Sequence, residues 1–277
     1  MTPRERFLLI VPGVLFLIAF GAFELGRLAS RKEAERKVAA RQPSSTATSK
    51  QDDATLIRSL KAQDLDQRRF SFSAVIEGAT GNKIIPFNPK NPAALLILEA
   101  IRKSADHAMQ LHSQEGSDLR GLRRINEGSR FFEDTLREQI DAHPALLCSI
   151  PLTSDGREQR MGYPDLRIEH VESGLVTYLD PKLYEEGSRA STLRSFYYKL
   201  GTQPSKVSED AQHLLLGFAH DGADGAWTFT SWDLLDLSNL TVGLKAEFQA
   251  SNQDLYEGDS GLASSRPAES SPRESVR

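Results

Sequence analysis

The chain has 277 residues, of which 39% are hydrophobic and 26% charged, and its formal charge is −4. This length allows one sizeable domain, and the single cysteine, Cys148, excludes an internal disulfide and is expected to be a small buried residue. There is no Gly-x-x-x-x-Gly-Lys phosphate loop, no His-Glu-x-x-His zinc pair and no Gly-x-Ser-x-Gly elbow. The six histidines also lack metal-ligand spacing, so these nucleotide, zinc and serine-hydrolase sites are excluded.

The N-terminal part contains an uncharged apolar run of 17 residues, Phe7 to Phe23, with weaker apolar character up to Leu28. After a flank at residues 1–6, we therefore predict a transmembrane helix over residues 7–28, which would contact the membrane. Six basic side chains follow between residues 27 and 41, against two before the run. The positive-inside rule then predicts a single-pass membrane protein whose folded part lies in the cytoplasm.

A cleaved signal peptide is the competing interpretation of the same run. Ala19-Phe20-Gly21 resembles a cleavage site, and cleavage would imply export. Glu24 near the boundary, together with the basic, helix-favouring stretch at residues 30–40, favours an uncleaved anchor.

Residues 29–53 combine a basic juxtamembrane segment with a linker rich in Ser and Thr. An N-terminal extension at 54–83 follows, with a short helix expected at 54–68 and a strand at 69–76. Because residues 1–41 hold eight basic and four acidic side chains, about −8 of formal charge is left for the rest of the chain. That acidic balance argues against broad, nonspecific DNA binding.

Two helices and a later series of strands are expected next. Apolar residues recur at three- and four-residue steps from Pro92 to His112, with proline near the helix start. A second helix is predicted over 119–141, closed by His143-Pro144. Helices followed by strands predict an α/β domain of mixed α+β type over residues 84–256, and the tail at 257–277 is expected to be disordered. The expected strands are 164–170, 175–180, 210–218, 227–232 and 240–248, and 192–198 is expected to be a strand or an extended segment.

The two strands at 164–170 and 175–180 are predicted to form a hairpin. The first strand alternates apolar and polar residues and the second does so in part, and the turn between them ends at Gly174, where a positive φ is expected. A hairpin centred between Glu172 and Ser173 places Asp165 opposite Asp180, with Lys182 on the same face. A three-residue turn with a bulge would shift this register by one. The opposite face would pack into a core through Leu166, Ile168, Leu175, Thr177 and Leu179.

Directly opposed residues of antiparallel strands have Cβ atoms about 4.5–5.5 Å apart. Carboxylates at that distance repel each other unless a divalent cation lies between them. The pairing of Asp165 with Asp180 therefore favours a metal-dependent site, and Lys182 would lie beside it.

Pro164-Asp165 and Asp180-Pro181-Lys182, together with an upstream helix containing Arg130 to Asp134, resemble the PD-(D/E)xK nuclease superfamily over residues 117–221. The resemblance implies a restriction endonuclease-like fold, with a central mixed sheet flanked by helices. It also implies a nuclease, an endonuclease-like hydrolase of phosphodiester bonds. Pro181 differs from the apolar, β-favouring residue usual at its position, and its missing N–H suits an edge strand or a strand end.

The resemblance further implies which residues carry the chemistry. Asp165 and Asp180, with the main-chain carbonyl of Pro181, would hold Mg²⁺ or Mn²⁺. Lys182 would orient or activate the attacking water and offset charge in the transition state. Glu133 best matches an additional acidic residue on the first helix, with Glu138 in reserve.

Nucleic acid is the implied partner, with DNA favoured over RNA. The cations that could contact its backbone are Arg189, Arg194, Lys199 and Lys206. His213, Trp227 and Trp232 are expected to be core residues rather than metal ligands or base-stacking groups.

Two functions from different classes remain. One is a membrane-anchored metal-dependent nuclease, and the alternative is a noncatalytic membrane-anchored binding or scaffold protein with an α/β domain. The nuclease requires Asp165, Asp180 and Lys182 to converge on one face around a cavity, whereas a scaffold leaves them free to diverge.

Overall fold

The computed structural model describes residues 50–201 and 204–256. The chain divides into two compact units, of which the first ends at Asp64 and the second begins at Leu65. Helix α2 (Lys50–Ala62) is the described element of the first unit and overlaps the helix predicted at 54–68. The predicted tail at 257–277 lies outside the described residues.

The predicted localisation at a membrane is contradicted and is withdrawn. Across the two described ranges, no helix combines the length and the apolar character needed to cross a bilayer. The longest of them, α4 (Pro92–His112), has 21 residues, but charged side chains between Glu99 and Asp106 interrupt it, and charges are costly in a bilayer. The predicted span at residues 7–28 lies outside the described residues, as does the alternative cleavage site at 19–21.

The second unit begins with a short strand and helices and continues with the strands of its main sheet. Its described elements are β1 (Arg69–Ser71), α3 (Phe72–Thr80), α4 (Pro92–His112), the 3-10 helix η1 (Ile125–Gly128), α5 (Ser129–Asp141), β2 (Leu146–Ser149), β3 (Leu166–His170), β4 (Leu175–Glu185), η2 (Glu186–Ser188), β5 (Gln212–His220), β6 (Phe229–Asp236), η3 (Leu237–Asn239), β7 (Thr241–Gly243) and α6 (Asn252–Tyr256).

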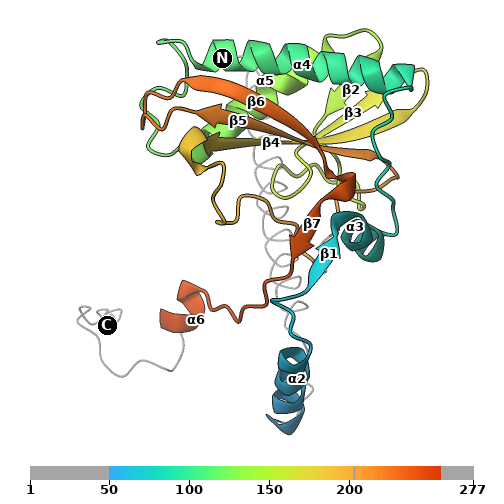
Figure 1. The fold of residues 1–277 in the computed structure, drawn as a ribbon, viewed down its shortest axis with the longest axis vertical. Helices are drawn as coiled ribbons and strands as arrows, with labels where there is room; N and C mark the ends of the chain where they lie inside the picture. The colour runs from blue at the N-terminus through green and yellow to red at the C-terminus, as the bar shows by residue number, and fades with distance from the viewer. Residues whose placement is uncertain (1–49, 202–203, 257–277) are drawn as a thin grey trace, which may run out of the picture. The chain divides into compact units, whose positions relative to one another are not determined.

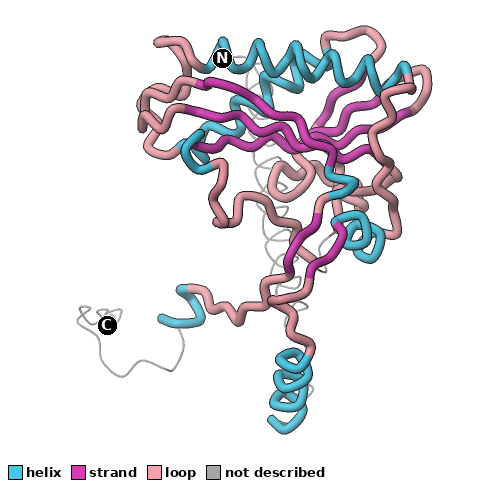
Figure 2. Tube along the Cα trace, viewed as in Figure 1, coloured by secondary structure: helices cyan, strands magenta, loops and turns pink. Residues whose placement is uncertain are grey.

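Within the described residues, the main sheet has five strands in the order β2-β3-β4-β5-β6. β4 and β5 are parallel, and the other neighbouring pairs are antiparallel, so the sheet is mixed. β1 and β7 form a separate antiparallel pair; Figures 1 and 2 show both sheets and the helices beside them. The predicted mixed α+β domain with a central mixed sheet flanked by helices is confirmed.

Helix α4 begins and ends where the sequence predicts. Asn91 caps it, because its Oδ1 accepts hydrogen bonds from the backbone N–H groups of Ala93 and Ala94 at 2.9 and 3.3 Å. Pro92 follows in the first turn, where a missing N–H and a fixed φ are tolerated. The capping and the apolar spacing together explain the helix from Pro92 to His112.

Helices α4 and α5 cover one face of the main sheet (Figure 1). Their apolar stripes pack against inward-facing residues of β3, β4 and β5. The main members of this first core are Ile97, Ile101, Ala105, Ala108, Phe132, Leu136, Ile140, Leu166, Ile168, Leu179, Leu214, Leu216 and Phe218. Leu166, Ile168 and Leu179 thus lie on the core face predicted for the hairpin.

A second core lies against β4 from α3 and the loop before β5. Phe72 and Ile76 of α3 are fully buried and cluster with Val176 and Tyr178 of β4 and with Ala211. Because Leu179 belongs to the first core and Tyr178 to the second, β4 is buried on both faces, as expected for a strand in the middle of a covered sheet.

The strand predicted at 69–76 is wrong beyond Ser71, where α3 begins. The Ser71 side chain caps this helix by accepting a hydrogen bond from the Ala74 N–H at 3.1 Å, and Gly81 ends it with a φ of 78°. The second predicted helix also begins later than expected, since α5 starts at Ser129 after the η1 turn. Of the strand predicted at 240–248, β7 retains only residues 241–243.

The hairpin register is confirmed. Leu166 lies opposite Leu179 and His170 opposite Leu175, with Gly174 in the turn at a φ of 66°. Because β3 begins at Leu166, β4 pairs only with β5 from Asp180 onward. Pro181 therefore lies in a central strand but in a stretch with a partner on one side, which explains how its missing N–H is tolerated.

Candidate active site

Asp165 and Asp180 come together at the start of β3. One step past the Leu166–Leu179 pair, the observed register directs Asp165 toward Asp180. Their side chains are 13% and 3% exposed, so both carboxylates are largely removed from water. The pKa of Asp180 is raised to about 7, first by burial and then by the negative charge of Asp165, although Lys182 opposes both effects.

Lys182 Nζ lies among three oxygens at the end of this hairpin. It forms an ion pair with Asp180 Oδ2 at 2.7 Å and donates hydrogen bonds to Asp165 Oδ2 at 3.3 Å and to the Pro181 carbonyl at 3.2 Å. Burial lowers the pKa of Lys182, but Asp180 and Asp165 outweigh burial, so the pKa is raised overall. The three oxygens that the sequence suggested as metal ligands thus all face one cation.

Asp180 Oδ2 is buried, and its polar contact among the described residues is the ion pair with Lys182 at 2.7 Å, which does not have good hydrogen-bond geometry. A buried carboxylate oxygen that is held by a cation in this way is also suited to bind a divalent metal.

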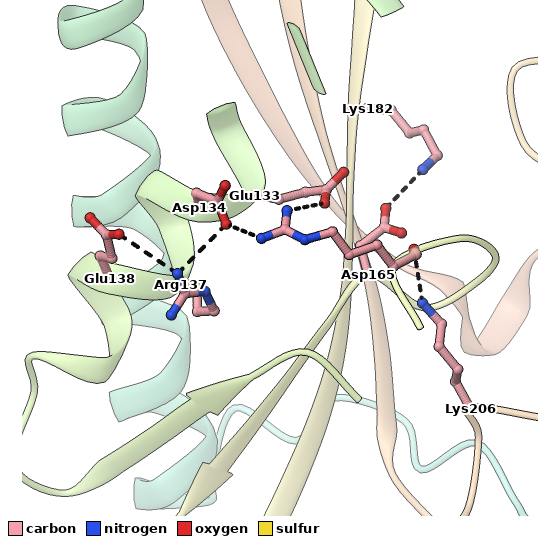
Figure 3. A network of polar contacts seen from close by, with 8 residues as sticks. Glu133, Asp134, Arg137, Glu138, Asp165, Lys182 and Lys206 are labelled. Atoms are coloured by element: carbon pink, nitrogen blue, oxygen red, sulfur yellow. Dashed lines mark hydrogen bonds and ion pairs between the residues drawn. The ribbon is translucent and has the colours of Figure 1, made fainter. Parts of the chain in front are cut away.

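Glu133 joins the site from α5, and Figure 3 shows it near Asp165. Its side chain is 17% exposed, and its pKa is raised by burial and by Asp165, against the lowering effects of Arg160 and Lys182. Glu138, the reserve candidate, is 68% exposed and pairs with Arg137 at 3.6 Å. The structure therefore brings Glu133 to the site and leaves Glu138 in solvent.

Two cations at the site come from loops. Arg160 lies 2.6 Å from Asp134 and 3.7 Å from Glu133, and its carbonyl accepts a hydrogen bond from Lys206 Nζ at 3.3 Å (Figure 3). Lys206 is only 3% exposed, and burial lowers its pKa although Asp165, Asp180 and Glu133 act to raise it. Lys206 thus belongs to the interior of the site, and sequence reasoning missed Arg160.

The other three cations suggested for DNA contact lie after Tyr184 at the end of β4. Arg189 is paired with Asp233, with its guanidinium nitrogens 2.6 and 3.1 Å from the two carboxylate oxygens. Arg194 is exposed, with its guanidinium carbon 5.1 Å from the centre of the Tyr197 ring. Lys199 is exposed as well.

The residues expected to be structural are buried or partly buried. Cys148 is 6% exposed, and burial raises its thiol pKa to about 12, so it is a poor nucleophile at neutral pH. Trp227 is 1% exposed and lies in the first core, whereas Trp232 is partly buried and donates from Nε1 to Asp106 Oδ1 at 2.7 Å. His213 is fully buried. None of these three rings is presented to a ligand as a free stacking surface.

The donor set at the hairpin consists of hard oxygens. In the part of the chain that the structure describes, no three His, Cys, Asp or Glu side chains cluster as a metal site by themselves. Asp165 and Asp180 instead form a pair that the Pro181 carbonyl completes. Oxygen donors of this kind suit Mg²⁺ or Mn²⁺ rather than a soft metal.

Comparison with known proteins gives concordant matches. The sequence model of the Type II restriction enzyme MjaV family matches residues 65–259. The chain is also similar to the Type II restriction enzyme MjaV of Methanocaldococcus jannaschii, with 27% identity over 205 residues, which cover 69% of this chain and 86% of that protein. Both matches include the hairpin and the helix that carries Glu133.

Proposed function

This chain belongs to the Type II restriction enzyme MjaV family, and we propose that it is a metal-dependent endonuclease that hydrolyses DNA phosphodiester bonds at the Asp165–Asp180 pair. The family implies the nuclease activity and DNA as the substrate. The observation that carries the assignment of the site is the convergence of Asp165 Oδ2, Asp180 Oδ2 and the Pro181 carbonyl on one cation, Lys182 Nζ. A scaffold would have no need for this convergence.

The residues fit a divalent metal. Asp165, Asp180 and the Pro181 carbonyl would hold Mg²⁺ or Mn²⁺, and the buried Asp180 Oδ2 has a lone pair available for it. When bound, such a metal lowers the pKa of a bound water and neutralises charge that develops on the phosphate. Glu133 supplies a third carboxyl group next to Asp165 and supports the site from α5.

Lys182 has the role of a fixed positive charge. Its ammonium group is held by two carboxylates and a carbonyl, and the two carboxylates raise its pKa against the effect of burial, which keeps it protonated. Placed beside the reacting phosphate, it would orient the attacking water and offset negative charge in the transition state. Lys206, buried in the same cluster, would balance the carboxylates rather than contact the DNA directly.

The exposed cations after β4 are the candidates for DNA backbone contact. Arg194 and Lys199 are free of ion pairs among the described residues, whereas Arg189 is occupied by Asp233. Phe196 and Tyr198 lie between Arg194 and Lys199 in the chain. Their rings pack near Tyr163, which is two residues before Asp165. Arg194 and Lys199 would thus bind phosphates close to the scissile bond.

The test uses the full chain with linear DNA, single-stranded DNA and RNA, in Mg²⁺, Mn²⁺ or EDTA. We expect metal-dependent cleavage of double-stranded DNA, reduced by at least about 100-fold in Asp180→Asn and in Lys182→Met. Asp155→Asn is the matched control, since Asp155 is an exposed carboxylate in the β2–β3 connection that pairs with Arg157. Cleavage that persists in EDTA, or at the control rate in Asp180→Asn, would contradict the proposal.

A further inference from the structure

A tyrosine and a histidine form a polar pair beneath the candidate site. The Tyr163 hydroxyl and His213 Nδ1 share a hydrogen bond of 2.7 Å. Their rings are nearly parallel, at 22°, with centroids 5.8 Å apart. The edge of Phe72 packs against Tyr163, and the rings of Phe196 and Tyr198 close the same cluster.

His213 lies in the interior on β5. Its side chain is fully buried, and it lies opposite Tyr178 in the parallel β4–β5 pairing. Nε2 of His213 has no hydrogen-bond partner among the described residues, so the bond to Tyr163 is the polar contact that fixes the ring. A buried polar atom left without a partner is uncommon and needs an explanation beyond packing.

The pair carries no charge at neutral pH. Burial lowers the pKa of His213 to about 4, against the opposing effect of Asp236. Burial, followed by Asp180 and Asp165, raises the pKa of Tyr163 well above its ordinary value. Tyr163 and His213 therefore act on the site through geometry and not through charge.

The position of Tyr163 in the chain connects this pair to Asp165. Only Pro164 lies between them, and its ring fixes φ, so the orientation of Tyr163 is transmitted to Asp165. On its other side, Asp165 is followed by Leu166, the first residue of the β3–β4 ladder. The Asp165 backbone is thus anchored at both ends, by the ladder and by the Tyr163–His213 bond.

The contacts that anchor Asp165 act against electrostatic repulsion from Asp180. Asp165 and Asp180 face each other, and their mutual repulsion favours movement of Asp165 away from the site whenever Lys182 or a metal does not hold it. Asp180 is held within β4, where it is paired with Leu215 in the continuous parallel ladder with β5. Asp165, at a strand start, is the one that is able to move.

We propose that Tyr163 and His213 are positioning residues that hold Asp165 beside Asp180 for metal binding, an inference that rests on the proposed function above. Neither would touch the metal or the substrate. Their loss would weaken metal binding, because groups that orient metal ligands typically contribute about 10- to 100-fold in metal affinity or activity.

The test compares the full-length wild-type chain with Tyr163→Phe, His213→Leu and Tyr178→Phe. Tyr178→Phe is the matched control, since it also removes one hydroxyl from this aromatic cluster, but that hydroxyl contacts Ser208 and not His213. Calorimetry without DNA gives the dissociation constant for Mn²⁺, and cleavage assays give the metal concentration at half-maximal rate. Binding of DNA in EDTA and thermal unfolding are measured on the same samples.

We expect Tyr163→Phe to raise the Mn²⁺ dissociation constant and the half-maximal metal concentration by about tenfold, with DNA binding in EDTA unchanged. Tyr178→Phe should keep wild-type values for both. A purely structural role would lower the unfolding temperature without shifting metal affinity in the folded protein. If His213→Leu does not fold, Tyr163→Phe decides the question alone.

Two negative results are distinguishable. If the wild type binds Mn²⁺ and cleaves DNA while Tyr163→Phe binds the metal as tightly as Tyr178→Phe does, the positioning role is overturned and the proposed function stands. If the wild type neither binds Mn²⁺ nor cleaves DNA, the proposed function fails and the positioning role falls with it.

Discussion

At the scale of single residues, the Lys182 ammonium group contacts the same oxygens that would attract a divalent cation. Its ammonium group contacts Asp180, Asp165 and the Pro181 carbonyl, and it relieves the repulsion between the two buried carboxylates. The same charge that keeps this site together without metal must therefore compete with a metal for the same oxygens. Lys182 is then expected to weaken metal binding while it promotes cleavage.

Substituting Lys182 separates these two effects. In Lys182→Met, Mn²⁺ should bind at least about threefold more tightly in calorimetry, because it no longer competes with the ammonium group; this factor corresponds to roughly 0.7 kcal/mol. Cleavage should nevertheless fall by at least about 100-fold, as argued for the proposed function. Lys61→Met, which removes an equal charge from α2, should change neither value. Weaker Mn²⁺ binding in Lys182→Met would show that the lysine supports the metal site instead of competing with it.

His213 gives a prediction about pH and stability. Its pKa falls from the ordinary 6.5 to about 4 in the folded chain, because burial disfavours the charged ring. The unfolded chain therefore binds a proton before the folded one does, so the stabilisation is present above pH 6.5 and is lost as the pH falls toward 4. Between pH 7.5 and 5 this amounts to about 2 kcal/mol.

Urea unfolding at pH 7.5, 6 and 5 measures this contribution. His213→Gln keeps a polar side chain but cannot take up a proton, so the stability gap between wild type and variant should narrow by about 2 kcal/mol on going from pH 7.5 to 5. Tyr163, Tyr178 and Asp236 surround the ring or act on its pKa, and they are the same in both proteins. A gap that is constant with pH would mean that His213 has the same pKa in the folded and unfolded chains, so that burial does not lower it.

At the scale of elements, α3 depends on its N-terminal cap. The Ser71 Oγ accepts a hydrogen bond from the Ala74 N–H, and the helix it starts places Phe72 against Tyr163. Ser71→Ala should lower the free energy of unfolding by about 1 kcal/mol, whereas Ser71→Asp, which keeps an acceptor, should stay near the wild type. Urea denaturation of the three proteins measures both. Equal losses in the two variants would show that the hydroxyl does not act as a cap.

Some of these elements can be predicted from the sequence, and others cannot. The hairpin register follows from the period-two pattern and the Gly174 turn, and both ends of α4 follow from Asn91-Pro92 and the apolar spacing, so these could be predicted. The helix α3 is hard to predict because Phe72, Val75 and Ile76 favour a strand, and the signals for a helix are the capping residues Ser71 and Gly81 at its two ends. Local sequence therefore predicts pairing better than it separates short helices from short strands.

The contacts of the candidate site also differ in whether the sequence predicts them. Asp165, Asp180 and Lys182 lie in one hairpin, so their meeting follows from local register. Arg160 and Lys206 reach the site from loops, and Lys206 bonds to a backbone carbonyl whose position depends on the fold of the whole domain. No periodicity in the sequence reports such contacts. The bond between Tyr163 and His213, 50 residues apart, is of the same kind.

At the scale of the whole molecule, an acidic chain has to bind an acidic substrate. With a formal charge of −4, the protein gains no long-range attraction to DNA from its net charge. Binding must then depend on a few local cations near the site, and Arg194 and Lys199 are exposed in the segment that packs by Phe196 and Tyr198 near Tyr163. Each phosphate that such a cation neutralises adds about 0.9 to the slope of log affinity against log salt concentration.

The double variant Arg194→Gln with Lys199→Gln should therefore lose both affinity and salt dependence. We expect the slope to fall by about 1.8 and the affinity to fall more at low salt than at high salt. The matched control removes two charges from α4, as Arg102→Gln with Lys103→Gln; these exposed cations pair with Glu99. Fluorescence anisotropy with duplex DNA in EDTA measures both slopes, at salt concentrations from about 50 to about 200 mM. If the control variant lowers the slope as much as the double variant does, net charge and not the segment after β4 governs DNA binding.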